Sequence, residues 1–279
     1  APEREGPRGR LAREARERVW PALRNAGFQL PERRVTVNLA PAERRKEGAS
    51  AELAVALGVL IATSQAPPMR LEATALLGEM ALDGALRPVR GTLALAEAAW
   101  RAGAHTLLCA AAAAPEAALV ESLTVHAVAT LGNAVDWLRG EELPRQSAAP
   151  PDPETRTDID LADVRGQAVA RRALEIAAAG GHALMLVGPP GTGKSMLARR
   201  LPEILPPLAA EEALVVTRLH SSAGLREPGR GLMRERPFRS PHHTVSRAGL
   251  VGGCSPPRPG GISLAHHGGL FLDEFAQYA

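Results

Sequence analysis

A glycine-rich loop carries the residues of this chain whose types and spacing most clearly suggest chemistry. Residues 188–195 read GPPGTGKS, so a lysine and a hydroxyl residue directly follow three spaced glycines. Glycines let backbone N–H groups curve around a phosphate, and the lysine adds a positive charge beside it. The predicted phosphate-binding residues are Gly188, Pro189, Pro190, Gly191, Thr192, Gly193, Lys194 and Ser195.

An acidic pair further along the chain complements this loop. The stretch GGLFLDE ends an apolar run with Asp273 and Glu274. In ATP-hydrolysing sites of this kind, the lysine bridges the β- and γ-phosphates and the hydroxyl holds Mg²⁺. We therefore assign Lys194 to the phosphates, Ser195 and Asp273 to Mg²⁺, and Glu274 to activation of the attacking water. Either motif alone could arise by chance, but together they predict an ATP site.

Two apolar strands must position these motifs. Residues 183–187, ALMLV, form a continuous apolar run, which is typical of a strand buried in a parallel sheet. A helix is expected to follow the loop. The GGLFLDE run is expected to be a second buried strand, whose end presents the acidic pair.

The first half of the chain has the pattern of a small α/β domain. Apolar residues four apart predict a helix within 9–28, and Asp-Gly at 83 and 84 predicts a β-hairpin. The other expected elements are a strand at 35–39, helices at 50–65, 92–103 and 115–122, and strands at 105–110 and 123–130.

Composition divides the chain into two domains and limits its location. The stretch 140–160 is rich in prolines and charges, so we interpret 1–139 as one domain, 140–160 as a linker and 161–279 as a second domain. The two cysteines cannot form a disulfide framework, and no apolar segment is long enough to span a bilayer. A cytoplasmic protein without membrane contact is expected.

The stretch KEGASAEL, residues 46–53, raises the question of a second active site. Ser50 either acts as a nucleophile or caps the apolar helix that follows it. A serine is a poor nucleophile near neutral pH unless a base takes its proton. Lys46 is the only nearby candidate and lies in a charged, solvated run. An N-cap role for Ser50 is therefore favoured.

Basic residues are concentrated between the two nucleotide motifs. They are Arg234, Arg236, Arg239, His242, His243, Arg247 and Arg258. Such a group can hold DNA phosphates without reading sequence, or it can be an ordinary solvated loop, and the pattern leaves both open. The best DNA-contact candidates are Arg236, Arg239, His242, His243 and Arg247. Phe238 is the only aromatic residue there, which argues against base stacking.

Several long segments resemble the Mg-chelatase-like AAA+ ATPases of the ComM/YifB type. These are residues 160–208, RPFRSPHHTVSRAGLVGG at 236–253 and SPPRPGGISLAHHGGLFLDE at 255–274. The resemblance implies a P-loop AAA+ domain with three αβα layers. It also implies a ring-shaped homo-hexamer that uses ATP and Mg²⁺ to drive DNA branch migration in natural transformation. The segment DVRGQ matches the part of such domains beside the adenine, which adds Val164 and Gln167 to the nucleotide site.

The same resemblance implies that the first domain has a Lon-protease-like fold related to ribosomal protein S5. It places Ser50 at the protease serine but Leu93 where the catalytic lysine belongs, so no peptidase activity is expected. Gly261 stands where relatives usually have glutamate. The family's first strands, and its sensor strand, arginine finger and helical lid, are expected to lie outside the given sequence, and turnover by this chain is expected to be poor.

Two other functions remain open at this level. One is the ATPase motor subunit of a magnesium chelatase, which the Lon-like domain disfavours because chelatase motors resemble only the second half of this chain. The other is a nucleotide-binding fragment that does not hydrolyse ATP.

Overall fold

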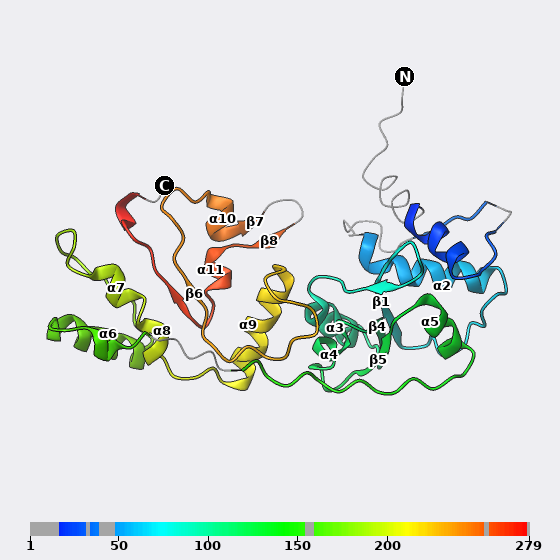
Figure 1. Cartoon of the computed structure of the whole chain (residues 1–279), viewed down its shortest axis with the longest axis horizontal. Helices are drawn as coiled ribbons and strands as arrows, with labels where there is room; N and C mark the ends of the chain where they lie inside the picture. Colours follow the sequence, from blue (N-terminus) through cyan, green and yellow to red (C-terminus); the bar gives the residue numbers. More distant parts are fainter. Residues whose placement is uncertain (1–16, 32–33, 39–47, 154–158, 254–256, 278–279) are drawn as a thin grey trace, which may run out of the picture. The chain divides into compact units, whose positions relative to one another are not determined.

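A computed structural model defines residues 17–31, 34–38, 48–153, 159–253 and 257–277. The chain divides into two compact units (Figure 1). The first comprises Ala1–Pro150 with Glu227–Gly231, and the second comprises Pro151–Arg226 with Leu232–Ala279. Within the described residues, no helix is both long and apolar enough to cross a membrane.

A parallel three-stranded sheet organises the first unit. Strand β4 (Thr106–Ala110) lies between β1 (Thr74–Leu77) and β5 (Thr124–Val128). Parallel neighbours need crossover connections, and helices α3 (Thr92–Arg101) and α4 (Ala114–Ala117) lie in them. The mixed α/β class expected from the sequence is thus confirmed for this unit.

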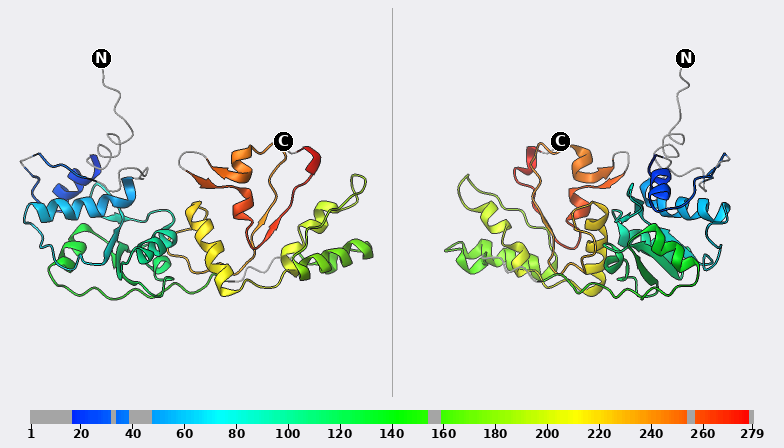
Figure 2. Two further views of the ribbon diagram at one scale, coloured as in Figure 1. Left: turned by 180° about the vertical axis from the view of Figure 1, so that it is seen from behind. Right: turned by 45° about the vertical axis from the view of Figure 1, so that its right-hand side comes forward.

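Helices cover both faces of this sheet. Helices α2 (Glu52–Ala62) and α5 (Leu131–Leu138) pack together on one face, and α3 and α4 lie on the other (Figure 2). Side chains alternate along β4 in agreement with this arrangement, since Leu108 packs with α2 and α5. Cys109 points to the opposite face, where burial and the charge of Glu116 raise the pKa of its thiol to about 12.

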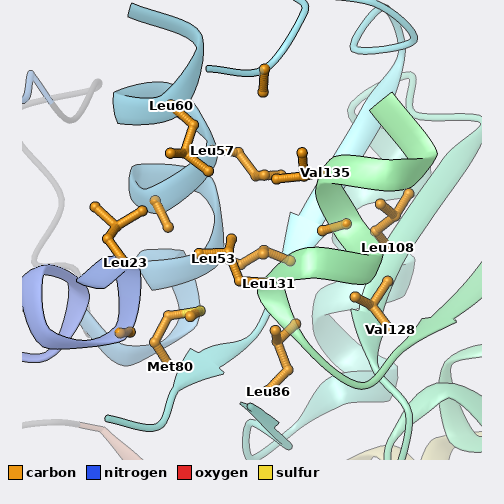
Figure 3. Packing of buried hydrophobic residues seen from close by; sticks show 14 of the residues in the cluster. Leu23, Leu53, Leu57, Leu60, Met80, Leu86, Leu108, Val128, Leu131 and Val135 are labelled. Carbon is orange, nitrogen blue, oxygen red and sulfur yellow. The ribbon is translucent and has the colours of Figure 1, made fainter. Parts of the chain in front are cut away.

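The core of this unit is aliphatic. Leucines of α2 meet Leu23 from the helical residues 17–25 and Leu131 and Val135 from α5 (Figure 3). Met80 and Leu86 close the cluster from the hairpin strands β2 (Glu79–Met80) and β3 (Leu86–Arg87). Each large aliphatic side chain buried there stabilises the fold by about 2–5 kcal/mol relative to alanine.

The expected β-hairpin is confirmed. Strands β2 and β3 are antiparallel, with Glu79 opposite Arg87. Gly84 has a φ of +85°, which glycine adopts without steric cost, and the Asp83 carboxylate accepts a hydrogen bond from the Ala85 N–H at 3.0 Å. The expected helix ending before Gly103 is also present as α3.

The second unit consists of two helices of 13 residues, α6 and α9, and otherwise short elements. They are η2 (Leu161–Asp163), α6 (Ala168–Gly180), α7 (Lys194–Ala198), α8 (Leu201–Ile204), α9 (Ala210–Ser222), β6 (Phe238–Arg239), α10 (Arg247–Val251), β7 (Gly252–Gly253), β8 (Arg258–Pro259), α11 (Gly261–Leu264), β9 (Gly269–Leu270) and η3 (Phe275–Gln277). Strands β6 and β9 pair in parallel and β7 and β8 pair in antiparallel. A small core of Leu161, Val164, Leu174 and Leu197 joins η2, α6 and α7.

The prediction of a strand at 183–187 is wrong. These residues form no strand, and the side chains of Met185 and Val187 are 79% and 83% exposed. An apolar run becomes a buried strand only when neighbouring strands hydrogen-bond to it, and none of the described strands pairs with this segment. The strand expected in GGLFLDE is present but short, as β9, and half-buried.

Three expectations for the first unit also need correction. Residues 35–38 are not a strand, and Leu39 lies outside the described residues. The helix expected at 115–122 is reduced to α4. Ser50 lies within the 3₁₀ turn η1 (Gly48–Ala51), and the N-cap of α2 is Ala51, so Ser50 does not occupy the capping position. The backbone of this turn instead contacts Gly78, whose N–H donates to the Ser50 carbonyl oxygen at 3.3 Å.

Candidate nucleotide site

The glycine-rich loop adopts a conformation that depends on two of its glycines. Gly191 and Gly193 have φ angles of +81° and +83°, which side chains with a Cβ rarely adopt. The Thr192 hydroxyl donates to the Pro189 carbonyl oxygen at 2.9 Å and holds the loop closed. A non-glycine residue at either glycine position would strain this backbone.

Lys194 lies at the end of the loop and points back into it. Its Nζ donates to the carbonyl oxygens of Gly188 at 2.8 Å and Pro189 at 2.9 Å. These carbonyl contacts hold the ammonium group against the residues of the motif. A phosphate entering the loop would offer the same donor a charged acceptor, which forms a stronger hydrogen bond.

The two motifs meet at Ser195 and Asp273. The Ser195 hydroxyl donates to Asp273 Oδ2 at 2.9 Å, although the residues are far apart in sequence. Asp273 follows β9, which pairs with β6. One further hydrogen bond, from the Phe271 N–H to the Arg239 carbonyl oxygen at 2.8 Å, continues this pairing toward Asp273. A hydroxyl and a carboxylate are hard oxygen donors, which suit Mg²⁺. The pair fits the proposed metal position.

Glu274 has a backbone conformation that is unusual for its residue type. Its φ is +53°, in the left-handed region, and its N–H donates to Asp273 Oδ1 at 3.1 Å. Its Oε2 lies 3.1 Å from Nδ1 of His243. The two adjacent acids therefore have different partners, since Asp273 contacts the loop serine and Glu274 contacts the segment after β6.

The segment DVRGQ contributes one residue to the loop and one to the core. Gln167 Nε2 donates to the Thr192 carbonyl oxygen, which connects the start of α6 to the glycine-rich loop. Val164 is 1% exposed and packs against Leu197 of α7. Gln167 therefore contacts the loop itself, whereas Val164 belongs to the small core that includes Leu197.

The predicted basic residues are in different environments. His242 and Arg247 are exposed, and Arg247 begins α10, which the Ser246 hydroxyl caps by accepting from the Gly249 N–H at 3.1 Å. Arg239 is half-buried in β6. His243 is half-buried and paired with Glu274.

Arg236 is bound within the protein. Its guanidinium donates to the carbonyl oxygens of Pro206, Pro207 and His267 and, at 2.8 Å, to Glu212 Oε2. The Ala209 N–H, and then Arg236, lower the pKa of Glu212 below its ordinary value, so this carboxylate is ionised. Arg236 thus connects the start of α9 to His267, two residues before β9, a link that no motif in the sequence indicated.

The stretch around Ser50, where the resemblance places a protease serine, has different contacts. Leu93, where the resemblance expects a lysine, is fully buried in α3. Beside Ser50, the Glu52 carboxylate is buried and accepts a hydrogen bond from the Met80 N–H at 2.8 Å. Lys46 lies outside the described residues. The contacts of this stretch connect α2 to the hairpin.

Comparisons with known proteins match almost the whole chain. A family model described as "Magnesium chelatase, subunit ChlI" matches residues 160–279, and one described as "Subunit ChlI of Mg-chelatase" matches residues 7–113. An uncharacterized protein of Mycobacterium tuberculosis is 48% identical over 95% of this chain and 53% of its own length.

Two further relatives have names that bear on the family. YifB of Salmonella typhimurium is 43% identical over 95% of this chain and 52% of its own length. The competence protein ComM of Haemophilus influenzae is 41% identical over 96% of this chain and 53% of its own length. The chain therefore spans about half the length of the curated relatives that it matches.

Proposed function

Because the chain belongs to the Mg-chelatase-like family that includes YifB and ComM, we propose that it binds ATP with Mg²⁺ and hydrolyses it as an AAA+ ATPase. The observation that carries the proposal is the 2.9 Å hydrogen bond between Ser195 and Asp273. It joins the end of the glycine-rich loop to the acidic pair, as a shared metal position requires.

Each motif then has a defined task. The loop N–H groups and Lys194 bind the β- and γ-phosphates, and Ser195 and Asp273 hold the metal, which neutralises charge that develops on the phosphate oxygens. Glu274 orients the attacking water and accepts its proton. Val164 and Gln167 lie on the adenine side of the loop in this proposal.

The proposed larger role is that of a ring-shaped homo-hexameric motor acting on DNA branches, which the resemblance to ATPases of the ComM/YifB type implies. One of the relatives is named a competence protein. The exposed side chains of His242 and Arg247, with the half-buried Arg239 of β6, would contact phosphates without reading sequence. Arg236 and His243 are engaged within the protein and are less available for this contact.

The proposed domain plan keeps the division made from the sequence. Residues 1–139 would form the Lon-like domain without peptidase activity, 140–160 the linker and 161–279 the three-layer P-loop domain. The proposed location is the cytoplasm, where ATP and DNA are both present.

The test is Mg²⁺-dependent ATP hydrolysis by the purified chain, with and without branched DNA. Lys194→Ala should weaken nucleotide binding by about 10- to 100-fold, because it removes charge-assisted hydrogen bonds to phosphate. The matched control is Arg172→Ala, which removes an exposed cation of α6 that is paired only with Glu175 in the described contacts. Unchanged affinity in Lys194→Ala would refute the site.

DNA stimulation separates the proposed functions. Turnover that rises with branched DNA, and less so at higher salt, supports the motor. The family-model descriptions favour a second candidate, the ATPase subunit of a magnesium chelatase. Turnover indifferent to DNA but coupled to Mg²⁺ insertion by a porphyrin-binding partner would select it, whereas binding without turnover would indicate a non-hydrolysing fragment.

A further inference from the structure

A cluster of three polar side chains lies around the start of α9, outside the residues assigned to the nucleotide site. Its centre is Glu212, whose Oε2 accepts from Arg236 Nη2 at 2.8 Å and whose Oε1 lies 3.3 Å from His267 Nδ1. Oε2 also accepts from the Ala209 N–H at 3.0 Å, which fixes the carboxylate on the first turn of α9. The cluster therefore joins three segments that are far apart in the sequence.

Every nitrogen of the Arg236 guanidinium donates a hydrogen bond within the protein. Besides the bond to Glu212, Nη2 donates to the Pro207 carbonyl oxygen at 3.2 Å. Nε donates to the Pro206 carbonyl oxygen, and Nη1 donates to that of His267 at 2.6 Å. A planar guanidinium presents its donors in a fixed geometry, which a lysine ammonium does not. The chain before β6 is thus fixed both to α9 and to the chain before β9.

His267 has a backbone conformation that needs support from its surroundings. Its φ is +55°, and a non-glycine residue in this left-handed region costs about 1–2 kcal/mol. Its carbonyl oxygen accepts from Arg236, and its ring contacts Glu212. At the next residue, a Cβ on Gly268 would lie 1.9 Å from the Pro237 carbonyl oxygen, so only glycine allows this close approach. The cluster therefore stabilises the turn that leads into β9.

The pairing of β6 with β9 contains few hydrogen bonds of its own. The two strands pair in parallel over two residues each. Main-chain bonds of 2.8 Å run from the N–H groups of Gly269 and Phe271 to carbonyl oxygens of the β6 segment. Extended by two residues toward the N-terminus, the same register places Arg236 opposite His267. The cluster thus adds side-chain contacts in the register that the short pairing adopts.

This register decides which residue meets the glycine-rich loop. A slip of one residue in a β-strand turns its side chains to the opposite face and moves the chain by about 3.3 Å. In the observed register, Asp273 accepts from the Ser195 hydroxyl at 2.9 Å. A slip would bring Leu272 or Glu274 toward this place instead. The hydroxyl and the carboxylate that suit Mg²⁺ would then no longer meet.

We propose that Glu212, Arg236 and His267 form a positioning cluster that sets the register of β6 and β9 and thereby places Asp273 beside Ser195 for the metal. This rests on the proposed nucleotide function and adds residues that support its metal position. The partners of the cluster are α9 and the chain before β9, so its effect on the metal passes through the strand and Asp273. The three residues are positioning residues and not catalytic ones.

The proposal predicts that Arg236→Met weakens metal binding without weakening nucleotide binding. Methionine fills part of the same space but donates no hydrogen bond. Affinity for Mn²⁺ in the presence of ADP, measured by EPR of the metal ion, should fall about 10-fold, as for other groups that orient a metal ligand. Affinity for ADP in EDTA should stay at the wild-type value, because the glycine-rich loop and Lys194 are unchanged. A general loss of folding would lower both affinities together.

Matched variants test the chemistry of the cluster. Arg236→Lys keeps the charge but loses the fixed donors, so its Mn²⁺ affinity should lie between those of the wild type and Arg236→Met. His267→Asn keeps a side-chain N–H donor and tolerates the left-handed region, so it should bind Mn²⁺ more tightly than His267→Ala. Arg172→Met, which removes an exposed arginine of α6 paired with Glu175, should match the wild type.

Amide hydrogen exchange reports on the strand pairing without any nucleotide or metal. The Phe271 N–H, bonded to the Arg239 carbonyl oxygen at 2.8 Å, should exchange about 10-fold faster in Arg236→Met, because the pairing loses a charge-assisted hydrogen bond that supports it. The Leu197 N–H, bonded to the Gly193 carbonyl oxygen at 2.9 Å in α7, should exchange at the wild-type rate.

The closing experiment combines these measurements in the full chain and contains no DNA, so loss of a DNA contact cannot produce the expected result. A wild type that binds ADP neither in EDTA nor with Mn²⁺ would refute the proposed function itself. A wild type that binds both, with Arg236→Met equal to it in Mn²⁺ affinity and Phe271 exchange, would overturn the positioning cluster alone.

A variant that loses both affinities together is decided by the milder substitutions. If Arg236→Met binds neither ADP nor Mn²⁺, Arg236→Lys and His267→Ala should still weaken Mn²⁺ binding while ADP binding in EDTA is retained. Equal loss of the two affinities in these variants would show that the cluster supports folding only, and would overturn the proposal.

Discussion

Two stretches of this chain each contain a serine that follows a lysine, and the contacts around the two serines differ in the structure. In GPPGTGKS, the Ser195 hydroxyl meets a carboxylate from a distant strand end. In KEGASAEL, the Ser50 carbonyl accepts from Gly78, and the nearby Glu52 carboxylate accepts from Met80 in the hairpin. The comparison shows that residue type and spacing suggest chemistry, while the partners supplied by distant segments decide it.

The largest effect is expected for a substitution of Asp273, the partner of Ser195. Asp273→Asn keeps the size of the side chain but removes its charge, so Mg²⁺ affinity or turnover should fall about 10- to 100-fold, as at other residues that support a metal. Titrating Mg²⁺ against ATP hydrolysis measures the change. Glu211→Gln, an exposed acid in the first turn of α9, is the control. A Mg²⁺ dependence like that of the wild type would remove Asp273 from the site.

The stretch around the second serine should affect folding more than catalysis. Glu52→Ala leaves the buried Met80 N–H without its acceptor and should lower the free energy of unfolding by about 1–3 kcal/mol. Urea denaturation measures this loss. Glu79→Ala, which removes a partly exposed partner of Arg18, should cost less than about 1 kcal/mol. Equal losses in the two variants would contradict a special role for the buried acid.

Stability of the second unit should depend on pH through His220. Burial lowers the pKa of this imidazole, whose Nε2 lies 3.0 Å from the Leu264 carbonyl oxygen. The unfolded chain therefore binds the proton first, and the contribution of His220 to stability is present above pH 6.5 and is lost as the pH falls through the lowered folded value.

The measurement for His220 is the thermal midpoint as a function of pH for the wild type and His220→Gln. The variant should be less stable at neutral pH, and its midpoint should depend less on pH below 6.5. Parallel curves for the two proteins would show that His220 is not the group responsible.

The smallest effect is expected for Ser50→Ala. Leu93 is buried where the resemblance expects a lysine, so removal of the hydroxyl should leave ATP turnover unchanged, and we expect no peptidase activity with or without it. A casein cleavage assay beside the ATPase assay checks both. Peptidase activity in the wild type that Ser50→Ala abolishes would reverse this interpretation.

Local sequence patterns correctly predicted the elements that are stabilised by contacts within the element or with a segment nearby in the sequence. The Asp83–Gly84 hairpin, α3 and the parallel strands β4 and β5 lie where turn residues and apolar alternation indicated. The prediction of a strand at 183–187 was wrong, because a strand needs hydrogen-bond partners that its own sequence does not contain. The prediction that Ser50 caps α2 was wrong, because the helix begins at Glu52 and its N-cap is Ala51.

For the candidate site, the sequence by itself determined the chemical groups: a flexible glycine-rich loop, a lysine, a serine and an acidic pair. Their types are local properties of the chain, readable without a fold. Only the tertiary structure decided that Ser195 meets Asp273, that His243 meets Glu274 and that Arg236 is bound to Glu212. These contacts join residues remote in sequence, and their distances depend on how every intervening segment packs.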